Sequence, residues 1–116
     1  MAYQLLICVV KDDDAVEEIL TGFLELGIGG ATVLTARGMA EIISSQISLF
    51  AGFRDVFKGG GTSRIILSAM PAEKISEAHH LIERLVQADT ISGGGVSFAV
   101  PIAANLGLDR QAVTDD

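Results

Sequence analysis

The sequence has 116 residues, the length of one domain, and carries 8 Lys and Arg against 15 Asp and Glu, a formal net charge of −7. Hydrophobic residues make up 49% of the chain and charged residues 20%, a composition that excludes a disordered segment. The acidic balance argues against a nucleic-acid-binding protein, and the single cysteine, Cys8, excludes an internal disulfide.

The beginning of the chain predicts a strand, a helix and a second strand. Tyr3–Val10 is nearly continuously apolar and rich in β-branched residues, which is typical of a central strand. The acidic residues 12–14 provide a helix N-cap, apolar residues recur at helical spacing over 16–24, and Gly27 ends the helix. Residues 31–36 form the second expected strand.

Residues 37–62 have no clear periodicity. A stretch of this length without regular structure is usually functional in a compact domain, so we expect a long loop here. Within it, residues 41–50 are expected to form a short helix on contact with a partner. The glycine run 59–61 lacks the Lys-Ser/Thr of a P-loop and precedes a strand rather than a helix, so we interpret it as a hinge of the loop.

The rest of the chain repeats the first pattern. Residues 64–69 predict a third strand, Pro71 suits the first turn of a second helix over 75–86, and a glycine turn at 93–95 precedes a last strand at 96–100. We expect one domain, 1–102, that contains the loop 37–62, followed by a weakly patterned C-terminal tail, 103–116.

This order of elements predicts a ferredoxin-like α+β sandwich. Two β-α-β units with right-handed crossovers interleave into a four-stranded antiparallel sheet with both helices on one face. The strands are apolar on both faces, so the face without helices is expected to be covered by self-association.

Two stretches of sequence resemble the nitrogen-regulatory P-II signal-transduction family. Gly27-Ile28-Gly29-Gly30-Ala31-Thr32-Val33, followed by Arg37-Gly38-Met39, is similar to the second strand of that family and the base of its mobile T-loop. Gly93-Gly94-Gly95-Val96-Ser97-Phe98 is similar to its B-loop. The resemblance extends over residues 3 to about 101, and the order and spacing of the motifs are more specific than any one motif.

The resemblance implies a homotrimer that binds an adenine nucleotide (AMP, ADP or ATP) between subunits and controls a protein target through the loop 37–62. Thr32 would contact the adenosine, and Gly38 and Met39 would line the cleft. The main chain of Gly93, Gly94 and Gly95 would approach the phosphates, as in an anion-binding nest. No obligatory cofactor is implied.

The sequence also departs from the family. Val96 stands where the family carries a B-loop lysine, Ala40 replaces the second glycine at the T-loop base, and residues 101–108 contain no Lys or Arg. Because the only tyrosine is Tyr3, the loop uridylylation of some members is not available. A nucleotide with fewer phosphates, or another small anion, is therefore as compatible with the sequence as ATP.

Charge adds a separate indication of an anionic ligand. Residues 37–64 hold four basic side chains, among them Arg37 and Arg64, against two acidic ones, a local charge of +2 on a chain that is otherwise −9. We interpret this island as a site for a small anionic metabolite or an acidic partner surface. The alternative is a loop whose charges are merely solvated.

The sequence does not suggest catalysis or a metal site. His79 and His80 are adjacent and point about 100° apart on a helix, so they do not readily bind one ion and are interpreted as surface histidines. Cys8 has no evident activating partner, and only Glu41 and Asp55 are candidates for an acid or base near bound phosphates.

We therefore expect a P-II-like regulatory protein rather than an enzyme. The alternatives are a small trimeric nucleotide hydrolase of the same fold and a structural trimer with a degenerate cleft. No signal peptide is recognised and no apolar stretch approaches the roughly 20 residues of a membrane span, so we expect a cytoplasmic protein without membrane insertion.

Overall fold

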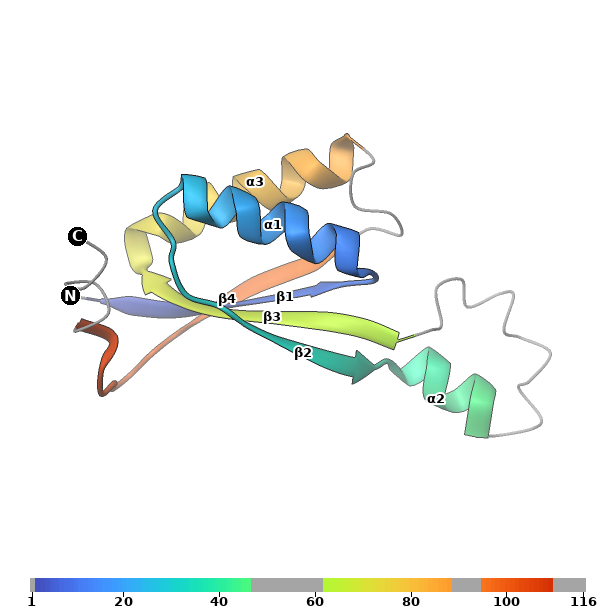
Figure 1. Ribbon diagram of the computed structural model, residues 1–116. Helices are drawn as coiled ribbons and strands as arrows, with labels where there is room; N and C mark the ends of the chain where they lie inside the picture. The colour runs from blue at the N-terminus through green and yellow to red at the C-terminus, as the bar shows by residue number, and fades with distance from the viewer. Residues whose placement is uncertain (1, 47–61, 89–94, 110–116) are drawn as a thin grey trace.

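The computed structural model describes residues 2–46, 62–88 and 95–109 (Figure 1). The elements follow one another as β1 (Tyr3–Val10), α1 (Asp13–Glu25), β2 (Thr32–Arg37), α2 (Met39–Gln46), β3 (Thr62–Pro71), a 3-10 turn (Ala72–Lys74), α3 (Ile75–Gln87) and β4 (Val96–Pro101). The glycine run 59–61, Gly93 and Gly94 lie outside the described residues. No helix in the described ranges is long and apolar enough to cross a membrane.

The four strands form one antiparallel sheet in the order β2-β3-β1-β4. Ile7, on the central strand β1, is paired with Leu67 of β3 on one side and Phe98 of β4 on the other. Helices α1 and α3 lie together on one face of this sheet (Figure 1). The ferredoxin-like α+β fold expected from the order of elements is confirmed.

The core lies between the sheet and these two helices. In β1 and β3 every second residue points into it, since successive side chains of a strand alternate between faces. The intervening side chains of the same strands point away from the helices, and together with those of β4 they form an apolar surface, here called the open face. The fully buried side chains of the core are contributed by β1, α1, β3 and α3, with Leu6, Ile19, Phe23, Ile66 and Met70 the largest.

The ends of α1 follow the residues predicted to define them. The side chain of Asp12 accepts a hydrogen bond from the backbone N–H of Ala15 at 2.8 Å, which satisfies one of the free donors of the first turn. Gly27 has φ +83°, a left-handed conformation that glycine adopts without strain. Its N–H donates to Leu24 O at 3.0 Å, and Ile28 N–H donates to Phe23 O at 2.8 Å. This turn sends the chain from the helix layer toward the sheet.

The expected long loop contains more regular structure than the sequence indicates. Helix α2 occupies Met39–Gln46 in the isolated chain, whereas a helix at 41–50 was expected only on contact with a partner. The helix begins as soon as β2 ends, with Ile42 N–H donating to Gly38 O at 3.1 Å. Arg37 and Glu41, one helical turn apart, form an ion pair at 3.4 Å that holds the first turn.

The close packing of α1 on α3 makes Gly22 a sensitive position. A Cβ at Gly22 would overlap the side chain of Leu81, whereas a Cβ at Gly38 would meet nothing within 4 Å. We expect Gly22→Val to lower the free energy of unfolding by about 1–3 kcal/mol, the usual cost of overpacking. Gly38→Val is the matched control and should change stability by less than about 0.5 kcal/mol. Urea unfolding of both variants measures the difference, and equal stabilities would contradict this account of the helix contact.

Candidate functional site

A pocket forms where β3 continues beyond its pairing with β2. Strand β3 has ten residues and β2 only six, so pairing between them stops at Thr32 and Leu67 while β3 runs on to Pro71. Residues 27–31 cross this gap on their way from α1 to the sheet. A cavity of about 580 Å³ lies between that segment and the end of β3, a volume in the range of small-molecule sites.

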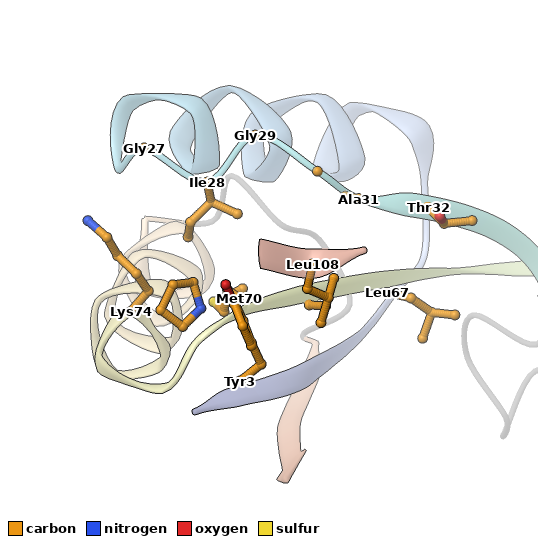
Figure 2. Close-up of a pocket in the computed structure, with 13 residues that line it drawn as sticks. Tyr3, Gly27, Ile28, Gly29, Ala31, Thr32, Leu67, Met70, Lys74 and Leu108 are labelled. Carbon is orange, nitrogen blue, oxygen red and sulfur yellow. The ribbon is translucent and has the colours of Figure 1, made fainter. Parts of the chain in front are cut away.

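The walls of this pocket are mainly main chain and apolar side chains (Figure 2). One wall is the glycine-rich segment, whose lack of side chains at three positions lets a ligand approach the backbone closely. Figure 2 shows Lys74 beside the Gly27 end of the pocket and Thr32 at the far end of the segment. The lining comprises Tyr3, Gly27, Ile28, Gly29, Gly30, Ala31, Thr32, Leu67, Ala69, Met70, Pro71, Lys74 and Leu108.

Two side chains hold the glycine-rich wall in place. The buried hydroxyl of Ser68 donates to Gly30 O at 2.6 Å, which ties the segment to β3 beyond the last pair of the β2–β3 ladder. The ammonium of Lys74 donates to Leu26 O at 2.9 Å, at the end of α1 where the helix dipole is negative. It also lies 3.6 Å from Glu77 Oε2. Lys74 thus fixes the start of the segment, and Ser68 its middle.

The structure separates the predicted site residues into two groups. Thr32 lines the pocket, on the open face beside its partner Leu67. Arg37, Gly38 and Met39 lie at the other end of β2, roughly 20 Å further along at the usual rise of a strand. The side chain of Met39 is 77% exposed there. Their contact with a ligand remains a prediction, and one elongated molecule would have to span both groups.

Arg64 and Gly95 lie at the same end of the sheet as Gly38. The pairing of Arg64 with Thr35 places it diagonal to Arg37 on the face that carries the helices. The Nε of Arg64 donates to Asp13 Oδ1 at 2.9 Å, just as Arg37 is paired with Glu41. The basic island seen in the sequence is therefore balanced in part by neighbouring carboxylates.

Several pocket residues were missed by the sequence reasoning. Tyr3, Lys74 and Leu108 come from the first strand, the turn before α3 and the C-terminal segment, and only folding brings them together. Tyr3 OH donates to Asp109 Oδ1 at 2.8 Å. This hydrogen bond, together with burial, raises the pKa of Tyr3. The motif around Gly27 did signal the glycine-rich wall, although its glycines were not counted as site residues.

The other chemically reactive side chains lie away from the pocket. Cys8 is fully buried in the core, and burial raises the pKa of its thiol to about 11. His79, expected at the surface, is half-buried with its Nδ1 at 2.7 Å from Ser97 Oγ, while His80 is exposed. In the described ranges no three His, Cys, Asp or Glu side chains are grouped to hold a metal ion.

Comparison of the whole structure with solved structures identifies the fold. No protein-family model and no curated protein matches the sequence. The structure is similar to CPII from Thiomonas intermedia K12, solved with ADP, AMP and acetate, with a TM-score of 0.64 and 14% identity over 92% of each chain. The chain has the P-II-like fold. It is also similar to the periplasmic divalent cation tolerance protein CutA from Archaeoglobus fulgidus, at a TM-score of 0.62 and 12% identity over 97% of this chain and 96% of that one. A protein of unknown function from Pediococcus pentosaceus gives a TM-score of 0.61 at 16% identity over 91% of this chain and 97% of that one.

The fold thus supports the resemblance of the sequence to the P-II family. At sequence identities this low, the solved structures are evidence for the fold alone. The two Thiomonas structures, one with ADP, AMP and acetate and the other with ADP, AMP and bicarbonate, show that this fold can hold adenine nucleotides in that protein.

The hydrogen bond of Ser68 offers a test of how the pocket wall is held. We expect Ser68→Ala to lower the free energy of unfolding by about 0.5–1.5 kcal/mol, the usual net contribution of one hydrogen bond, because the exposed Gly30 loses its tie to β3. Ser76→Ala is the control, since Ser76 is exposed on α3. Chemical denaturation of both variants measures the effect, and equal midpoints would show that Ser68 does not anchor the segment.

Proposed function

We propose that this protein is a P-II-like regulator that binds a small anionic effector, an adenine nucleotide, in clefts between the subunits of a homotrimer. The observation that carries the proposal is the pocket beside the glycine-rich segment. Thr32 lines this pocket, and the pocket borders the apolar open face of the sheet. The nucleotides in the Thiomonas structures of the same fold support this choice of ligand class.

The open face supports the assembly. Alternation in the strands places Ile7 and Leu67 on this face between Phe98 and Thr32, and none of the described helices covers it. At the β4 edge, Val96, Phe98 and Val100 remain 59%, 47% and 41% exposed. Burying such a surface against further copies of the chain is strongly favourable, and a ring of three covers every copy equally. A pocket at the border of this face then becomes a cleft between subunits.

The two groups of site residues suit the two ends of a nucleotide. Thr32 and the apolar pocket walls would hold the base and ribose. Gly38 and Arg37, at the far end of β2, would face the phosphates together with Arg64 on β3 and Gly95 before β4, which lie at the same end of the sheet. Binding at both ends of β2 would link the ligand to helix α2, which begins one residue after Gly38. The bound state would thereby shift the population of conformations that the loop 37–62 offers to a protein target.

The proposed role is binding without catalysis. Of the two candidates for an acid or base, Glu41 forms the ion pair with Arg37, and Asp55 lies outside the described residues. Adenine nucleotides are abundant in the cytoplasm, and we expect the protein to act there.

Calorimetric titration with AMP, ADP and ATP tests the ligand. We expect binding with a preference for AMP or ADP over ATP, because Val96 stands where a lysine would contact the phosphates. Gly38→Val should weaken binding at least roughly tenfold without lowering the melting temperature, since the isolated chain has room for the side chain there. No heat with any nucleotide would contradict the proposed effector. Release of phosphate by the pure protein would favour the hydrolase alternative instead.

Substitution on the open face tests the assembly. Phe98→Glu places a charge within the proposed interface, so we expect the trimer mass from light scattering to fall to that of a monomer. Leu24→Glu is the control, because Leu24 is 69% exposed but belongs to α1 on the opposite side of the sheet. If both variants keep the wild-type mass, the open face does not form the subunit interface.

A further inference from the structure

The segment that follows β4 returns to the pocket instead of leaving the domain. The last pair of β4 with β1 joins Pro101 to Gln4, after which Ile102 N–H donates to Tyr3 O at 3.1 Å. Gly107 has φ +104°, a conformation that glycine adopts without strain. Leu108 then lines the pocket, and Asp109 accepts the hydrogen bond of Tyr3.

Tyr3 is buried in a place where the helices do not cover it. Leu6 points into the core, and side chains alternate along β1, so the side chain of Tyr3, three residues earlier, lies on the open face. Tyr3 is nevertheless only 6% exposed. It is also absent from the cluster of buried residues packed between sheet and helices. Two of its hydrogen bonds join it to the segment 102–109: its carbonyl accepts from Ile102 N–H, and its hydroxyl donates to Asp109.

Between these two attachments the segment has little to hold it. Residues 103–106 are all exposed, and Leu106 is 90% exposed. Segments with few buried contacts open locally at much lower free energy than the core does. The hydroxyl–carboxylate hydrogen bond at the far end is charge-assisted and joins the exposed Asp109 to the buried Tyr3.

We propose that segment 102–109 is a strap that forms one wall of the pocket, and that the hydrogen bond between Tyr3 and Asp109 is the clasp that keeps it closed. Opening the clasp withdraws Leu108 from the pocket, so the clasp controls how fast a ligand enters and leaves. Tyr3 and Asp109 are positioning residues, because they act through the placement of Leu108. The strap itself follows from the contacts of this chain, and only the use of a nucleotide as its ligand rests on the proposed function.

A cysteine probe tests the strap without any ligand. Leu108→Cys places a thiol on the strap, and the native Cys8 is fully buried and does not compete for the reagent. We expect the labelling rate of this cysteine by a thiol-specific disulfide reagent to rise roughly tenfold when Tyr3→Phe is added, which is the effect of losing one hydrogen bond to a charged group. The phenylalanine keeps the aromatic wall and removes only the hydroxyl.

Variants at the other side of the clasp separate its role from general destabilisation. In the Leu108→Cys background, Asp109→Ala should accelerate labelling as Tyr3→Phe does. Asp109→Asn should give a rate between those of the parent and Asp109→Ala, because its amide oxygen still accepts the tyrosine hydrogen but without the charge. Equal labelling rates in all four proteins would overturn the strap. The strap would also be overturned if the labelling rates of the variants simply increased as their melting temperatures fell.

Stopped-flow kinetics with a fluorescent N-methylanthraniloyl derivative of ADP test whether the strap controls the entry and exit of a ligand. We expect Tyr3→Phe, with Leu108 intact, to raise both the association and the dissociation rate roughly tenfold and to change the dissociation constant much less. If the derivative binds and its rates do not change, the strap does not control ligand access and the inference fails. If the labelling responds as expected and no nucleotide binds, the proposed effector fails while the strap stands.

Discussion

The sheet has two apolar faces and the chain supplies helices for only one of them. In β1 the residues that point into the core alternate with Leu5, Ile7 and Val9, which are just as apolar, and β3 repeats this pattern with Ile65 and Leu67. Alternating apolar and polar residues would have given a sheet with one side in water. Instead, the hydrophobic effect that closes α1 and α3 over one face acts equally on the other. The proposed self-association of the open face would satisfy both faces with one sequence.

The pocket follows from the route of the chain between these two layers. Helix α1 ends above the sheet, and the chain needs residues 27–31 to descend to the start of β2. Those residues do not pair with β3, so its last residues are left with a partner on one side only. Glycines on one side and Leu67 and Ala69 on the other keep this gap open. The same route places the pocket at the border of the open face, where a second subunit would complete it.

The regular part of this fold could be predicted because it is encoded locally. The apolar run 3–10, the Asp12 cap and Gly27 each specify a strand, a helix start or a helix end within a few residues, and the structure agrees at all three. A helix at 41–50 was expected on contact with a partner because the apolar residues of 37–62 are scattered without clear periodicity. The first turn of α2 is held in the isolated chain by the pairing of Arg37 with Glu41.

The candidate site was predicted only where a motif marked it. Thr32 and the glycines around it belong to a short stretch with a recognisable pattern. Tyr3 and Asp109, by contrast, are 106 positions apart, and Lys74 reaches Leu26 across 48 positions. Contacts of this kind depend on how the finished layers pack, and neither periodicity nor composition carries information about them.

The electrostatics of the site favour a ligand of modest charge. Arg64 and Arg37 are each held by a carboxylate, and Lys74 donates to the carbonyl end of α1. A phosphate group that engaged either arginine would have to compete with Asp13 or Glu41 and would meet their negative charge at close range. Each added phosphate increases that repulsion, and Val96 offers no further cation to offset it. Main-chain N–H groups can recognise an anion without a net positive charge, so for the proposed effector the balance of these terms would favour a nucleotide with one or two phosphates.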